Sequence, residues 1–236
     1  HPLIPREGAD VDEAARGASV DELANAICEG LEHLPSRFVK RQAAFVRKKR
    51  SADGGFAGRR GGSDLYYTSF GLRLADVLDP EAGELRCAVA GWLQGRGAQV
   101  GDAVDALCLL DSLHILARYG DAPEGLRKEA SATVPTVLEA RRTRGGWSKE
   151  PGGAPSVYHT FLSDICYARL ALDMPDADNV IAMVLSRQQA DGGFADLPGG
   201  RSGVNPTAAA VDLLWRRESL AEEVSDAARD YIATMQ

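Results

Sequence analysis

Two acidic residues and one histidine stand where this chain could do chemistry, because each follows a glycine-rich turn. Asp64 follows the Gly-Gly-aromatic phrase at 54–56, and His159 follows the one at 145–147. Asp105 follows a glycine-rich stretch that has no aromatic residue. Carboxylate and imidazole groups are zinc ligands, so one hypothesis is a metal pocket lined by all three. The alternatives are helix capping for the two aspartates and a hydrogen-bonded core role for the histidine.

The glycine-rich turns form an internal repeat. Gly-Gly-aromatic phrases occur at 54–56, 145–147 and 192–194, and their first gap of 91 residues is close to twice the second gap of 47. A degenerate copy is therefore expected at 95–101. In each turn one glycine should supply a positive φ, and the aromatic residue should pack between neighbouring hairpins. A repeat of this length indicates one supersecondary unit used several times.

The segments between the turns predict helices and no convincing strand. Ser19, with Glu22 in a capping box, opens the first helix, and residues 1–18 are expected to be a loose leader before a single domain over 19–236. The later helices are expected at 36–49, 65–78, 84–95, 101–119, 124–142, 156–173, 177–190, 206–218 and 220–235. Alternate helices, such as 101–119, are apolar nearly all round and should form an inner layer, whereas amphipathic ones such as 124–142 should lie outside. The expected fold is all-α, an α/α toroid of about five helical hairpins joined by the Gly-Gly-aromatic turns.

Composition bounds the class of partner. The chain has 236 residues, 44% of them hydrophobic, and a formal net charge of −7. This acidic balance argues against nucleic acid as the main partner. The basic cluster between Arg37 and Arg50 is interpreted as a solvated helix face, or as a local site for an anion or a partner. The four cysteines form no CxxC pair and lie among apolar residues. Neither a signal peptide nor a membrane span is evident in the sequence. We therefore expect a cytoplasmic protein.

The turns resemble the repeat shared by protein prenyltransferase β subunits and squalene-type triterpene cyclases, over roughly residues 36–236. Residues 188–194, Gln-Gln-Ala-Asp-Gly-Gly-Phe, look like the prenyltransferase repeat and like the glutamine–tryptophan motif of the cyclases. In protein prenyltransferases a similar turn is followed by Arg and then by Asp-x-Cys-Tyr-Ser, where Asp and Cys ligate zinc and Arg and Tyr hold the prenyl diphosphate. By that resemblance Asp64 matches the zinc ligand and Tyr67 the diphosphate ligand, while Tyr66 replaces the cysteine.

The zinc histidine of the family lies in Asp-x-Phe/Tyr-His-Thr, and Tyr158-His159-Thr160 matches it, with Ser156 in place of the Asp. In the family the Asp/Cys repeat and the His repeat are neighbours around the ring. Here the degenerate repeat lies between them, and Asp105 falls where the histidine would be. Zinc held by Asp64, Asp105 and His159 is therefore an expectation that rests on this resemblance.

The resemblance implies a prenyltransferase-like protein that binds an isoprenoid or its diphosphate, with transfer to a thiol or another small nucleophile left open. Arg59, Arg60 and Tyr67 would hold the diphosphate, and Lys149 or Arg201 are further candidates. Other inner-helix residues would line the ring or simply fill its core: Tyr66, Phe70, His114, Tyr158, His159, Phe161, Tyr167 and Trp215.

Two alternatives remain. The first is a non-catalytic α-toroid that serves as a binding or assembly module. The second is a terpene cyclase, but its Asp-x-Asp-Asp acid has only a near match at residues 10–13, within the expected leader. Complete toroids of the family have more hairpins than the five expected here. The ring is therefore expected to be smaller, to be open, or to be completed by a protein partner or a second copy.

Overall fold

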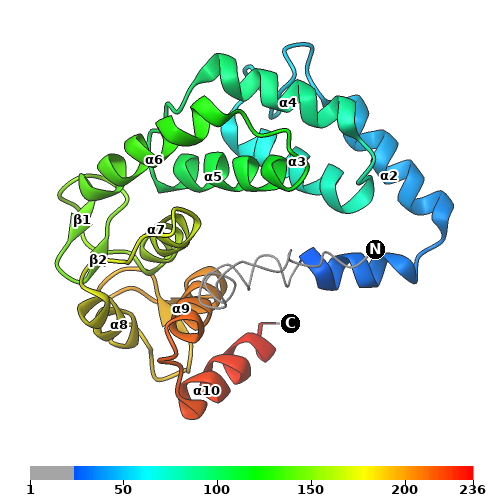
Figure 1. Cartoon of the computed structure of the whole chain (residues 1–236). Helices are drawn as coiled ribbons and strands as arrows, with labels where there is room; N and C mark the ends of the chain where they lie inside the picture. Colours follow the sequence, from blue (N-terminus) through cyan, green and yellow to red (C-terminus); the bar gives the residue numbers. More distant parts are fainter. Residues whose placement is uncertain (1–23, 236) are drawn as a thin grey trace. The chain divides into compact units, whose positions relative to one another are not determined.

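The structure, a computed structural model, describes residues 24–235 (Figure 1). The predicted leader at 1–18, which contains the near match at 10–13, lies outside the described residues. The predicted cap at Ser19 with Glu22 lies outside them as well.

The described chain is built from helices joined by short turns, as predicted. Residues 24–32 are helical. The helices that follow are α2 (Ser36–Lys49), α3 (Leu65–Leu78), α4 (Gly83–Arg96), α5 (Ala103–Arg118), α6 (Glu124–Glu139), α7 (Val157–Arg169), α8 (Ala177–Leu185), α9 (Val204–Arg216) and α10 (Glu222–Ala233). Most bounds agree with the sequence prediction to within a few residues, and the all-α class is confirmed.

The main differences lie where a helix runs into a repeat turn. Short antiparallel strands form there: β1 (Arg142–Thr143) pairs with β2 (Gly146–Trp147), and β3 (Phe194–Ala195) pairs with β4 (Ser202–Gly203). Helix α6 ends before β1, and α8 ends five residues earlier than predicted, since Gln188 already bridges to Phe194. Strands of two residues are too short to show an alternating pattern, so they could not be predicted from the sequence.

Contacts divide the described residues into two compact units, the first ending at Val134 and the second beginning at Pro135. In the first unit α3 contacts α2, α4 and α5, and in the second α9 contacts α7, α8 and α10. Most residues of α5 and α7 are buried, whereas α6 buries one stripe, Leu126, Ala130, Val134 and Leu138. The predicted alternation of enclosed and amphipathic helices is therefore confirmed.

The first glycine of each repeat turn has a positive φ, at Gly54 (98°), Gly145 (91°) and Gly192 (85°). Sterics give a second reason for glycine, which the sequence did not reveal. A Cβ at Gly54 would lie 2.5 Å from the Ala88 carbonyl oxygen of α4, and one at Gly192 would meet the Ala227 carbonyl of α10. These two turns are thus pressed against the backbone of the next outer helix, whereas a Cβ at Gly145 would first meet the side chain of Met183, at 3.2 Å.

The aromatic residue of each turn is buried, with Phe56, Trp147 and Phe194 at most 5% exposed. Its backbone N–H donates to a buried threonine one turn into the following inner helix, over 2.9 Å in all three copies. The pairs are Phe56 with Thr68, Trp147 with Thr160, and Phe194 with Thr207. These threonines stand 12 or 13 residues after the aromatic residue, a regular spacing that sequence reasoning missed.

Candidate functional site

The N-terminus of α3 is fixed by the turn that precedes it. Asp53 Oδ1 accepts hydrogen bonds from Gly55 N (3.1 Å) and Ser63 Oγ (2.8 Å), which pins both ends of the intervening loop. Asp64 caps the helix by accepting from Tyr67 N over 2.7 Å. Between these anchors the loop carries an exposed pair of arginines at 59 and 60. The loop therefore presents two cations beside a rigid helix start.

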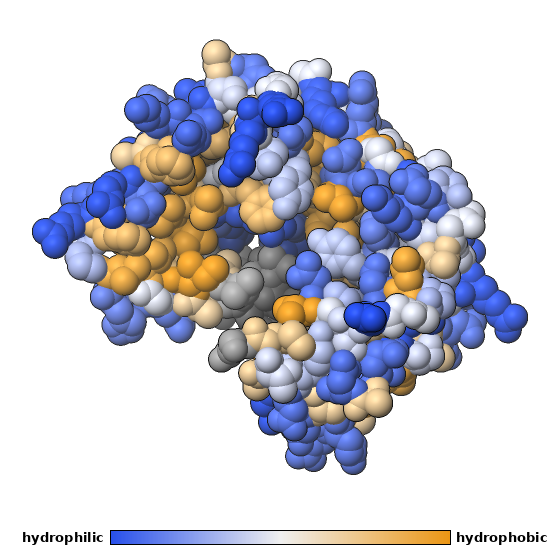
Figure 2. Space-filling model, turned by 180° about the vertical axis from the view of Figure 1, so that it is seen from behind, coloured by the Kyte–Doolittle hydropathy of each residue, from blue (hydrophilic) through white to orange (hydrophobic). Residues whose placement is uncertain are grey.

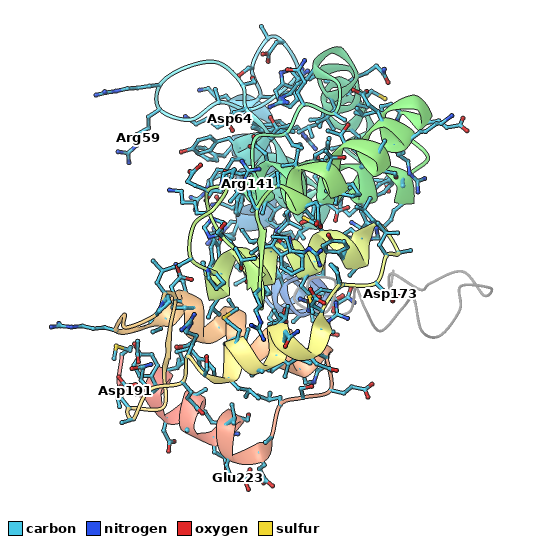
Figure 3. The ribbon with its side chains drawn as sticks, turned by 90° about the vertical axis from the view of Figure 1, so that its left-hand side faces the viewer. Arg59, Asp64, Arg141, Asp173, Asp191 and Glu223 are labelled. Carbon is cyan, nitrogen blue, oxygen red and sulfur yellow. The ribbon has the colours of Figure 1, made fainter. Side chains whose placement is uncertain are left out.

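Figure 3 shows Arg59 on this loop ahead of α3, with its side chain directed away from the helices, and Asp64 at the helix start. The loop also rests on an aromatic ring, because a Cβ at Gly58 would lie 2.9 Å from Cζ of Tyr67. The predicted diphosphate residues Arg59, Arg60 and Tyr67 thus belong to one local structure.

One side of α3 exposes large apolar side chains. Tyr66, Tyr67, Phe70 and Leu74 are 46%, 45%, 45% and 50% exposed. The Tyr66 ring lies 5.4 Å from that of Tyr67 and 4.8 Å from that of Phe70, measured between centroids. The residues recur at helical spacing, so they form a continuous row that begins beside the arginine loop. We call this row the α3 face.

A third cation lies along the α3 face. Arg73 forms an ion pair with Asp111 of α5, whose side chain is only 2% exposed, and its guanidinium lies 5.7 Å from the Phe70 ring centre. The ion pair ties α3 to α5 and holds Arg73 beside the aromatic row.

The N-terminus of α7, in the second unit, has a different arrangement. Ser156 Oγ donates to Asp196 Oδ1 over 2.7 Å and accepts from His159 N over 3.1 Å. The same oxygen lies 3.1 Å from His159 Nδ1. Because the serine proton is directed to Asp196, the hydrogen-bond pattern assigns the imidazole proton to Nδ1. Asp196 also accepts from Tyr158 N over 2.9 Å, so it anchors the start of α7. Sequence reasoning missed Asp196, which lies two residues after the aromatic residue of the next turn.

The remaining α7 candidates separate into surface and core. Tyr158 is 38% exposed, and its ring centre lies 6.4 Å from that of the half-buried Phe161. Tyr167 is instead a core residue, packed on Trp147 at 5.5 Å, which bears out the core alternative for this position. Trp215, on α9, is 47% exposed.

The fully buried Asp164 carries an ion-pair network between α7 and α9. It accepts from Arg217 Nε over 2.9 Å and also pairs with Arg216, whose guanidinium lies 5.8 Å from the Phe161 ring centre. This network holds the two inner helices of the second unit together.

The three proposed metal ligands form hydrogen bonds near the helix starts, as in the alternative roles of helix capping and hydrogen bonding. Asp105 Oδ2 accepts from Gly101 N over 3.1 Å, and Asp105 N donates to Asp102 Oδ1 over 2.9 Å, which is a reciprocal cap at the start of α5. Within each unit, the described residues include no group of three or more His, Cys, Asp and Glu side chains that could hold a metal ion. Zinc held by Asp64, Asp105 and His159 stays a prediction.

A cavity of about 280 Å³ lies between the end of α2 and the start of α4. It is lined by Arg47, Arg50, Glu81, Ala82, Gly83, Glu84 and Leu85. Arg47 and Arg50 belong to the basic cluster that the sequence analysis considers as a local site for an anion or a partner. None of the predicted isoprenoid, diphosphate or metal residues lines the cavity. The α3 face is an exposed row and lies outside this cavity.

The model of the prenyltransferase alpha-alpha toroid domain matches residues 22–102 and 99–236. The chain belongs to this family. The match confirms the suspected resemblance and the all-α toroid fold. A search of the curated proteins finds no match. Among the described helices, none has both the length and the apolar character needed to cross a membrane.

Proposed function

We propose that the α3 face and the Arg59–Arg60 loop bind an isoprenoid diphosphate, with the diphosphate at the loop and the isoprenoid chain along the helix. The observation that carries this proposal is the continuity of an exposed aromatic row with a two-arginine loop. An amphiphile that has an anionic head and an apolar tail matches both parts at once.

The apolar surface exposed along α3 is the reason to propose an isoprenoid chain as part of the ligand. Single exposed apolar residues are ordinary, but a contiguous row of them marks a binding surface. From Tyr66 to Leu74 the helix rises about 12 Å. Covering such a row with an apolar chain yields about 25 cal/mol for each square ångström removed from water. The α3 face therefore favours an extended hydrocarbon chain as the ligand.

The positive charge of the loop before α3 is the reason to propose a diphosphate as the head of the ligand. Residues 57–62 contain two arginines and no acidic residue. A guanidinium binds a phosphate through two parallel hydrogen bonds, an arrangement that a lysine cannot reproduce. The nearby Asp64 carboxylate accepts from the backbone of Tyr67, which turns it toward the helix. The arginines are thus left to meet an anion.

Binding is the proposed activity, and a transfer step to a thiol or another small nucleophile stays a prediction. The position that resembles the zinc thiolate of protein prenyltransferases holds the phenol of Tyr66. Burial raises the pKa of the Cys108 thiol to about 11, so this thiol is neutral at ordinary pH. A non-catalytic binding module is consistent with the phenol at position 66, and the neutral Cys108 offers no thiolate of the chain's own as a metal ligand.

The test is a titration of the full chain with farnesyl diphosphate, with inorganic pyrophosphate and farnesol as half-ligands. Farnesyl diphosphate should bind more tightly than either half-ligand. Arg59→Ala combined with Tyr67→Phe should weaken its binding at least about tenfold, or about 1.4 kcal/mol. Phe70→Ser combined with Leu74→Ser should weaken farnesol as well, because it removes the apolar contacts.

The comparison variant is Lys149→Ala with Arg201→Ala, which removes the two further diphosphate candidates, both exposed cations of the second unit. This variant should bind farnesyl diphosphate like the wild type. If it loses affinity while the Arg59/Tyr67 variant does not, the diphosphate lies elsewhere and the proposed site is wrong.

A further inference from the structure

Helix α2 concentrates positive charge in an acidic protein. Its sequence, SRFVKRQAAFVRKK, has six basic residues and no acidic one, whereas the whole chain has a formal net charge of −7. Helix α2 packs against α3, and its buried residues are Ala43 and Val46. The charge is therefore carried by the rest of the helix surface.

Two phenylalanines stand among these cations. Phe38 is 37% exposed and Phe45 57% exposed. They are seven residues apart, which places them on one side of the helix about 10 Å from each other. That side differs from the one that buries Ala43 and Val46. In the space-filling view, apolar residues gather at the left, over the side of the first unit along which α2 runs (Figure 2).

The cations lie at the level of the rings. The Arg41 guanidinium is 5.5 Å from the Phe38 ring centre, and the Lys49 ammonium is 5.3 Å from that of Phe45. Arg47, in contrast, forms an ion pair with Asp79. Helical geometry places Lys48 beside Phe45 and Arg41. We call the set Phe38, Arg41, Phe45, Lys48 and Lys49 the α2 face.

We propose that the α2 face binds an anionic phospholipid surface. A helix of this kind lies in the membrane interface with its aromatic rings among the acyl chains and its basic side chains at the headgroups. Lysine and arginine suit that place because their long stems reach from the apolar layer to the anionic groups. Each basic residue near such a surface contributes to binding.

Charge and shape favour a lipid surface over a protein partner. The face is a single row on one helix, and a bilayer accepts such a row along its whole length. A stable protein interface needs about 800 Å² from each partner, which calls for more than one row. The proposal rests on α2 alone and is independent of the ligand bound at the α3 face. Because α2 packs against α3, docking of α2 would also bring the proposed isoprenoid site near a lipid phase.

The experiment is co-sedimentation of the full chain with vesicles that contain no isoprenoid. Vesicles of phosphatidylcholine mixed with phosphatidylserine should bind the protein, and vesicles of phosphatidylcholine alone should bind it at least about tenfold more weakly. Raising the salt concentration well above about 0.15 M should release the protein, because salt screens exposed charges. Arg41→Gln combined with Lys48→Gln should reduce binding about tenfold or more.

The matched control is Arg127→Gln with Lys128→Gln, which neutralises two exposed cations on α6 and should bind like the wild type. Phe38→Ser with Phe45→Ser should reduce binding even in low salt, and a urea unfolding curve for each variant verifies the fold. Equal binding by the α2 and α6 variants would overturn the proposal. So would retention on an acidic polypeptide column that depends on α2, together with no binding to the anionic vesicles, because α2 would then face a protein.

Discussion

Replacing Gly192 by alanine should destabilise the protein far more than the same replacement at Gly199. Both glycines have a positive φ, 85° and 69°. An L residue there costs about 1–2 kcal/mol, and the lost freedom of the unfolded chain offsets about 0.4–1 kcal/mol of that cost. At Gly199 a new Cβ would meet no described atom within 4 Å, so this net cost is the whole expected effect.

At Gly192 the new methyl group would lie 2.8 Å from the carbonyl carbon of Ala227 and closer still to its oxygen. Backbone atoms of α10 cannot rotate away as a side chain can, so the turn and the helix must separate. Forcing extra volume into packed structure costs about 1–3 kcal/mol. The free energy of unfolding should therefore fall by about 1–3 kcal/mol more for Gly192→Ala than for Gly199→Ala.

Urea unfolding followed by tryptophan fluorescence measures both variants, with the slope of each transition checked for constancy. The Gly192→Ala midpoint should lie clearly below that of Gly199→Ala. If the two midpoints coincide, the turn does not press on α10, and the steric reason given for the repeated glycine is wrong.

Four further predictions test other parts of the structure. Thr207→Val keeps the shape of the side chain but leaves the Phe194 N–H without its acceptor. Urea unfolding should therefore show that the free energy of unfolding falls by about 1–3 kcal/mol. The control Thr133→Val, at a half-buried position on α6, should change it very little. Asp164→Ala leaves two arginines without their buried carboxylate, so the free energy of unfolding should fall by about 3–5 kcal/mol, measured as a large drop in Tm. The control Asp212→Ala removes a more exposed ion pair and should lower the free energy of unfolding by less. A colorimetric thiol reagent at pH 8 should react quickly with the exposed Cys87 and slowly with the buried Cys108. Equal rates in variants that keep only one of these cysteines would contradict the burial of Cys108. The folded chain keeps the Cys108 proton up to about pH 11, whereas the unfolded chain loses it near pH 9. The free energy of unfolding should therefore fall as the pH rises between these two values. Cys108→Ala should make that fall shallower.

The sequence predicted the fold closely because its signals are local and repeated. A glycine pair with an aromatic residue, recurring in register, left little choice for the turns, and the apolar pattern of 101–119 led directly to the buried helix α5. The second reason for glycine at Gly192 was out of reach, because it depends on where α10 packs. Residue types near one position do not reveal the backbone of a distant helix.

The candidate site was only partly predictable. The grouping of Arg59, Tyr66 and Tyr67 followed from their nearness in the chain. The structure shows the Tyr66 and Tyr67 rings in contact and Gly58 of the arginine loop against Tyr67, while a site formed with Arg59 stays a prediction. The bonding of His159 did not follow, because Asp196 comes from a different turn and reaches Ser156 only through the packing of neighbouring repeats. Long-range hydrogen bonds of this kind have no signature in a single sequence.

The central claim, an isoprenoid diphosphate site along the α3 face, is tested most directly by photolabelling. A farnesyl diphosphate analogue with a photoreactive group on its tail would be bound, irradiated and mapped after cleavage at arginine and lysine. The label should fall on residues 61–73, which contain Tyr66 and Phe70, and excess farnesyl diphosphate should prevent it. A label that falls mainly on the second unit, or one that farnesyl diphosphate does not displace, would contradict the proposed site.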